Sequence, residues 1–128
     1  RELRAVGFDV DFAPVLDVDT NPLNPVIADR SLGADARVVA ELGAALIDGI
    51  QSEGVAACGK HFPGHGDTRL DSHHDLPRLD HDLDRLESVE LLPFKRCLHA
   101  AGMMSSHIIL RRLGAVRRVT VSPRVLPD

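Results

Sequence analysis

The sequence predicts an α/β fold in which parallel strands alternate with helices. Short apolar runs of strand length recur along the 128 residues, and long helical patterns separate them. Parallel strands joined through helices connect by right-handed crossovers. Because this alternation is interrupted at both ends of the chain, we expect a piece of a larger closed barrel, with about three strand-helix units present.

Apolar runs mark three expected strands, at residues 8–13, 55–60 and 103–106. The second strand gives way directly to polar residues, so a long loop is expected over 62–82. Another loop, rich in proline and asparagine, is expected over 14–29. Both loops follow strands, where parallel α/β folds build their active sites.

Two long helices are expected between the strands. Residues 34–52 form an amphipathic pattern whose apolar side holds Leu42, Leu46, Ile47 and Ile50. Residues 84–101 form the second pattern, which opens with a capping box from Asp84 to Glu87. Pro93 should break or kink this helix, because proline has no N–H to donate.

The ends of the chain look interrupted. It begins at Arg1, inside what fits the last turn of a helix over residues 1–6. Near the other end, Ser122 and Pro123 are typical of the N-cap and the first position of a helix that is just opening. We therefore expect an interior fragment of a longer protein, in which residues 1–128 are part of a single domain truncated at both ends.

Composition argues against several classes of function. The net charge is −4, and the nearest basic groups, at 111–112 and 117–118, lack interleaved aromatic residues, so no nucleic-acid partner is expected. No apolar run approaches the roughly 20 residues that span a bilayer, so no membrane partner is expected. Cys58 and Cys97 are expected to be free core thiols, which fits a cytoplasmic location.

The densest chemistry lies in residues 60–75. This stretch brings together a lysine, several histidines and three carboxylates, namely Lys60, His61, His65, Asp67, Asp71, His73, His74 and Asp75. Gly64 and Gly66 flank His65 and permit a sharp turn that brings backbone N–H groups near a ligand. An ordinary structural turn is the alternative explanation for the glycines.

Asp71 and His73 stand two residues apart. In an extended segment their side chains point to the same side, so the carboxylate can hold an imidazole N–H and fix its tautomer. Such an arrangement suits a histidine that exchanges protons near neutral pH. Taken alone, however, an Asp-x-His pair is more often a surface ion pair than a catalytic one.

The flanking residues of this pair resemble a known family. The stretch from Lys60 to Gly66, followed by Asp71-Ser72-His73, resembles the signature of the bacterial β-N-acetylglucosaminidases of glycoside hydrolase family 3. Weaker matches cover residues 12–18, 24–27, 30–31 and 91–95. The resemblance runs from about residue 7 to 126, is strongest over 60–75 and weakens after 103.

The resemblance implies that this chain is a fragment of a (β/α)8 TIM-type barrel. It also implies an enzyme that hydrolyses terminal β-linked N-acetylglucosamine by a retaining mechanism. The substrate would be a cell-wall muropeptide fragment in peptidoglycan recycling, or a chito-oligosaccharide, and no cofactor or metal is implied. His73 maps onto the family's acid/base and Asp71 onto the carboxylate that holds it, in place of the carboxylic acid that most glycosidases use. Substrate-binding roles map onto Arg30, Lys60 and His61, with Asp17 and His65 as further site residues.

Other functions remain open at this point. The family nucleophile, an aspartate on a later strand, would lie beyond residue 128. A metal-dependent hydrolase could use His61, His65 and His73 with Asp71 or Asp75, because imidazole and carboxylate bind zinc or iron. A non-catalytic sugar-binding relative would lack the nucleophile. A phosphorylase is the third alternative, because a histidine acid/base would not repel a phosphate dianion.

Overall fold

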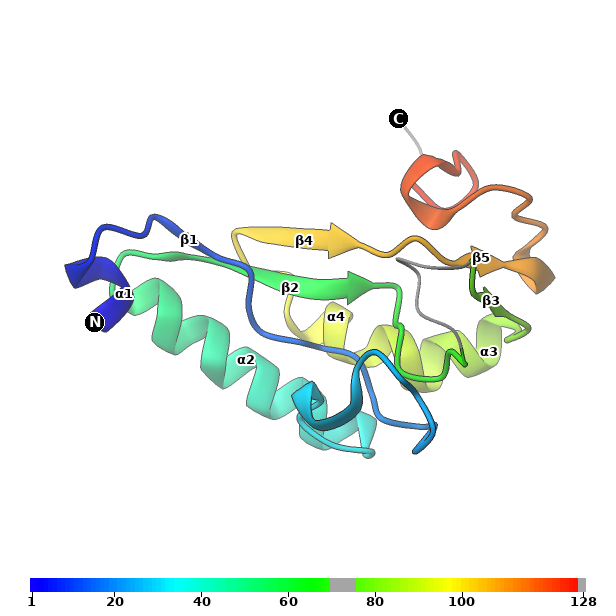
Figure 1. The fold of residues 1–128 in the computed structure, drawn as a ribbon, viewed down its shortest axis with the longest axis horizontal. Coiled ribbons are helices and arrows are strands. Elements are labelled where there is room, and N and C mark those ends of the chain that lie inside the picture. The colour runs from blue at the N-terminus through cyan, green and yellow to red at the C-terminus, as the bar shows by residue number, and fades with distance from the viewer. Residues whose placement is uncertain (70–75, 127–128) are drawn as a thin grey trace.

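A computed structural model describes residues 1–69 and 76–126 of the chain (Figure 1). Its elements in chain order are α1 (Glu2–Ala5), β1 (Val10–Asp11), the 3-10 turn η1 (Ala28–Arg30), α2 (Ala36–Ser52), β2 (Ala56–Phe62), β3 (Arg78–Leu79), α3 (Leu83–Arg85), the π-helical turn η2 (Leu86–Glu90), α4 (Leu91–Arg96), β4 (Gly102–Ser105), β5 (Ile109–Leu110), and the 3-10 turns η3 (Arg111–Leu113) and η4 (Val119–Val121). No helix in this part of the chain is long and apolar enough to cross a membrane.

The three expected strands lie in one parallel sheet of order β1-β2-β4. Both α2 and α4 lie on the same side of this sheet (Figure 1). The α/β class and the parallel strands are therefore confirmed, while the closed barrel stays a prediction. β2 is central, so its carboxyl end is held by neighbours on both sides.

β1 is shorter than the expected strand over 8–13, and the chain beyond it stays close to β2. The carbonyl oxygens of Ala13 and Pro14 accept hydrogen bonds from the N–H groups of Cys58 and Lys60. Pro14 has no N–H to return, so regular pairing stops there. The loop after β1 is thereby held against β2 as far as an isolated bridge between Val15 and Lys60.

α2 begins at Ala36 because the side chain of Asp35 caps it, accepting from the N–H groups of Arg37 and Val38. The expected apolar side of this helix was partly wrong. Leu42 and Leu46 are exposed, while small residues face the sheet; the buried residues of α2 are Val39, Ala40, Gly43, Ala44 and Ile47. Small side chains allow the helix to approach the sheet closely, because a Cβ at position 43 would overlap Leu16.

The second helical region runs without a break through α3, η2 and α4. It is capped by Asp82, which accepts from the N–H of Arg85, so the capping box expected at Asp84 was wrong. Pro93 does not end the helix, which continues to Arg96. A widened π-helical turn precedes the proline, and such turns rearrange the backbone hydrogen bonds that proline cannot complete. The region ends at residue 96 instead of the expected 101.

A second, two-stranded parallel sheet was not foreseen from the sequence. It pairs β3 with β5, and each strand has only two residues, too few for a periodic pattern. The N–H of Ile109 also donates to the carbonyl oxygen of Pro77. This small sheet ties the end of the histidine-rich loop to the segment that follows β4.

Two apolar clusters form the core, and Phe62 packs against both. The first, between the main sheet and its helices, consists of Leu16, Ala44, Ile47, Ala57, Phe94 and Cys97. The second, around β3 and β5, consists of Leu79, Leu86, Ile108, Leu110, Ala115 and Val119. The ring of Phe62 meets that of Phe94 edge to face at 5.5 Å. The carboxyl end of β2 is therefore fixed where the polar residues begin.

Candidate functional site

The predicted site residues start at the carboxyl end of β2, between the loop after β1 and the loop after β2. Lys60 and His61 are the polar residues at this end of β2, and both are half-buried. Asn24, from the first loop, is buried and donates to the carbonyl oxygens of His65 and Gly66 in the second. The two loops thus form one structure around the strand end.

Asp17 is the centre of this structure. Its carboxylate is fully buried and accepts from the backbone N–H of His61, from Nδ1 of the same ring at 2.7 Å and from the N–H of His65 at 2.6 Å. Because Nδ1 carries the hydrogen in this contact, Nε2 of His61 faces the other way as the second functional atom of the ring. Both oxygens of Asp17 are occupied by protein donors, so the geometry suits a support of the site.

His65 belongs to the same buried network. Its side chain is only 2% exposed, and its Nδ1 lies 2.6 Å from the hydroxyl of Thr68. The rings of His61 and His65 approach edge to face with centroids 6.3 Å apart. A histidine so deeply buried shapes the loop, and its contact with a sugar stays a prediction. Sequence reasoning missed Thr68 and Asn24 as site residues. Asn24 contacts His65 and Thr68, which lie more than forty residues away in the sequence.

Gly64 and Gly66 are required by close packing. A Cβ at Gly66 would overlap the carbonyl oxygen of Val18. Gly64 has a φ of +133°, and a Cβ there would lie 2.9 Å from Cβ of Glu90. The expected sharp turn is present, and its cause is contact between protein segments.

Arg30 and Lys60 supply the positive charges expected to bind sugar hydroxyls. Arg30 is the last residue of η1. It is exposed, and its guanidinium donates to the carbonyl oxygen of Val26. Within residues 1–69 and 76–126, neither side chain forms an ion pair. The sugar-binding role of both residues stays a prediction.

Asp71 and His73, the expected acid/base pair, lie outside the described residues, as does Asp75. Among the residues that are described, no group of three or more His, Cys, Asp or Glu could hold a metal ion. His61 and His65, two of the proposed metal ligands, use their Nδ1 atoms in contacts with Asp17 and Thr68.

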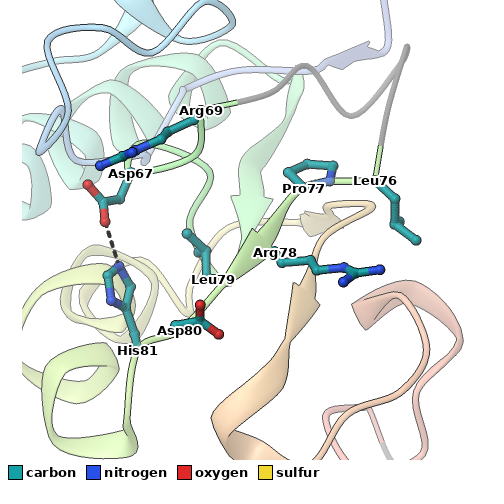
Figure 2. A pocket seen from close by; sticks show the side chains of 8 residues that line it. All are labelled: Asp67, Arg69, Leu76, Pro77, Arg78, Leu79, Asp80 and His81. Carbon is teal, nitrogen blue, oxygen red and sulfur yellow. Dashed lines mark ion pairs between the residues drawn. The ribbon is translucent and has the colours of Figure 1, made fainter.

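His81, near the end of the loop after β2, is largely buried. Its side chain is 17% exposed, and Nε2 lies 2.8 Å from Oδ2 of Asp67. The pair borders a pocket of about 640 Å³ between the loop after β2 and β3, shown in Figure 2. No sequence pattern links residues 67 and 81, whose contact depends on the fold.

Known proteins are similar to this chain in sequence and in fold. The family description "Glycosyl hydrolase family 3 N terminal domain" matches residues 1–128. Beta-hexosaminidase A of Pseudoalteromonas piscicida is 48% identical over 111 residues, which are 84% of this chain and 19% of that protein. The beta-hexosaminidase of Thiobacillus denitrificans is 45% identical over 116 residues, which are 89% of this chain and 32% of that protein.

Solved structures agree with these relatives. A glycoside hydrolase family 3 beta-N-acetylglucosaminidase from Paenibacillus sp. superposes with a TM-score of 0.94 at 45% identity, covering 97% of this chain and 24% of that one. NagZ from Neisseria gonorrhoeae, solved in complex with N-trifluoroacetyl-D-glucosamine, gives a TM-score of 0.85 at 38% identity, covering 92% of this chain and 35% of that one.

The chain spans about a fifth to a third of the length of these curated relatives. The family match nevertheless extends over all of its residues. The chain belongs to the glycosyl hydrolase family 3 N-terminal domain family.

Proposed function

We propose that this chain is the acid/base and sugar-binding part of a β-N-acetylhexosaminidase that removes terminal β-linked N-acetylglucosamine. The supporting observation is the agreement, at 45% identity and a TM-score of 0.94, with a beta-N-acetylglucosaminidase of the same family. The site geometry adds that β2 ends in two polar side chains, one of which is oriented by a buried carboxylate.

In the proposed mechanism His73 is the proton carrier. As imidazolium it protonates the oxygen of the leaving sugar while an aspartate beyond residue 128 attacks the anomeric carbon and forms a glycosyl-enzyme. As neutral imidazole it then takes a proton from the water that hydrolyses this intermediate. Asp71 holds the ring and stabilises its charged form.

The remaining site residues bind and orient the sugar. Lys60 and Arg30 can donate several hydrogen bonds each to hydroxyl oxygens, and His61 presents Nε2 because Asp17 holds its Nδ1. Held in this way, the ring has little freedom left to lose when a sugar binds. We propose muropeptide fragments of cell-wall recycling as the substrates, with chito-oligosaccharides as the alternative, and a cytoplasmic location.

The experiment uses the full-length protein that contains this chain. We expect it to release nitrophenol from an aryl β-N-acetylglucosaminide, and to do so equally well with and without phosphate. Dependence on phosphate would indicate a phosphorylase, and no turnover would contradict the proposal. Residues 1–128 alone should be inactive, because the proposed nucleophile is not among them. Measurable turnover by the pure 128-residue chain would show that this assignment of the nucleophile is wrong.

A further inference from the structure

A charged cluster joins the two ends of the histidine-rich loop. Nε2 of His81 lies 2.8 Å from Oδ2 of Asp67 and 3.7 Å from Oε1 of Glu90, and it forms a hydrogen bond with neither oxygen. Arg85 approaches the same Glu90 oxygen at 2.9 Å. Asp67 precedes residues 68–80 and His81 follows them, and Figure 2 shows this pair beside the pocket.

Burial of the Glu90 carboxylate in this cluster costs desolvation free energy. Glu90 is 3% exposed, on the π-helical turn η2, and its second oxygen has no hydrogen-bond partner in the described part of the chain. Taking a carboxylate out of water costs several kcal/mol before its partners compensate, and an apolar side chain of similar size would often give equal or greater stability. Stability alone therefore explains the cluster poorly.

Its place in the fold suggests a second purpose. Glu90 packs directly against Gly64, where the loop leaves β2, and through His81 and Asp67 it reaches both ends of residues 68–80. Fixing both ends of a chain segment reduces the conformations open to it. β3, at residues 78–79, anchors the same segment independently through β5, so loss of the cluster should loosen the segment without unfolding the domain.

We propose that Asp67, His81 and Glu90 act as a clasp that fixes the ends of residues 68–80 and so positions the acid/base histidine of the proposed glycosidase. This inference rests on the proposed function. It uses only the described ends of the segment. Because catalysis loses rate steeply when a reacting group is displaced by about 1 Å, a loosened clasp should lower turnover more than substrate binding.

The test compares two His–Asp pairs in the full-length protein. Asp67→Asn, His81→Gln and their double variant remove the ionisable groups of this pair with little change of shape. The control is the pair of His99 and Asp48, 3.2 Å apart, which links α2 to the turn after α4. Asp48→Asn and His99→Gln are the matched control variants.

Kinetics on two substrates separates positioning from general damage. On a disaccharide, whose leaving group needs a proton, each clasp variant should lower kcat about tenfold with KM within about twofold, and the double variant should lose little more. On a dinitrophenyl glycoside, which needs no proton, the loss should be much smaller. The control variants should change neither. Equal losses on both substrates, or losses no larger than those of the controls, would overturn the clasp.

A second readout does not depend on activity. Amide hydrogen exchange of peptides covering 68–80 should be faster in Asp67→Asn than in wild type and unchanged in Asp48→Asn. If the wild-type protein turns over no N-acetylglucosaminide, the proposed function fails and exchange alone decides the clasp. Equal exchange in Asp67→Asn and wild type would overturn it in either case.

Discussion

Two histidine–carboxylate pairs in this chain are built in opposite ways. Asp17 is fully buried and accepts from two backbone N–H groups as well as from the ring of His61. Asp67 is 28% exposed on its side chain, and within residues 1–69 and 76–126 its ion-pair partner is the ring of His81. The first pair is part of the backbone architecture of the site, whereas the second joins segments that could separate. We therefore expect substitutions at the first to cost stability and those at the second to cost mainly rate.

The largest effect is expected for Asp17→Asn. The amide offers one acceptor and two donors where three donors converge, so it would leave buried N–H groups unpaired. We expect a loss of about 3 kcal/mol in the free energy of unfolding and a raised KM, because His61 loses its orientation. Denaturant unfolding and steady-state kinetics of the full-length protein check this.

The half-buried Asp19 provides the matched control for that substitution. Asp19→Asn should leave both the unfolding free energy and KM nearly unchanged, since no described side-chain contact depends on its charge. Equal effects at the two positions would remove the distinction drawn between Asp17 and an ordinary loop carboxylate.

A second effect is expected for Gly66→Ala, which tests how tightly the two loops meet. The added methyl would overlap the carbonyl oxygen of Val18, so one loop must shift. We expect a loss of about 2 kcal/mol, read as a lowered melting temperature. Gly49→Ala is the control, because nothing lies within 4 Å of its Cβ, and in the interior of α2 it should stabilise by about 0.5–1 kcal/mol.

A smaller effect is expected for Glu90→Gln, on the side of the second pair. The substitution removes the buried charge but keeps a group that Arg85 can still bond, so the loss of unfolding free energy should be about 1–2 kcal/mol. A loss as large as that of Asp17→Asn would show that the two halves of the site are equally integral to the fold. Chemical denaturation of both variants under one condition makes the comparison.

The smallest effect comes from a residue outside both pairs. Burial raises the pKa of the Cys97 thiol to about 11 from its usual 9.0. An unfolded thiol therefore ionises first, so the contribution of Cys97 to stability is fully present below pH 9 and is lost as pH rises toward 11. We expect Cys97→Ala to flatten the decline of the melting temperature over this range. An unchanged slope would contradict it.

The sequence predicted the strands of the main sheet because their apolar runs are long enough to show a pattern. Prediction from the sequence failed where tertiary contacts alone determine the local structure. β3 and β5 have only two residues each, too few to show a periodic pattern. Pro93 was expected to break or kink the helix, but the π-helical turn before it accommodates the missing N–H donor. Leu42 and Leu46 were misplaced because the helix packs through small residues.

The site residues likewise fall into those that the sequence predicted and those that it missed. Local chemistry pointed to Lys60 and His61 at the end of β2, and the turn at Gly64 was expected. The supports were missed, because Asn24, Thr68 and the partners of His81 act across distances that no motif records.

In the proposed function, His73 of this chain transfers the proton of an N-acetylglucosaminidase. The most direct measurement is pre-steady-state kinetics of His73→Ala in the full-length protein, on a natural disaccharide and on a dinitrophenyl glycoside. We predict a loss of roughly 10²–10⁴ on the disaccharide and a far smaller loss in the first chemical step on the activated glycoside. Equal losses on both substrates would contradict the acid role of His73 and reopen the metal-dependent alternative.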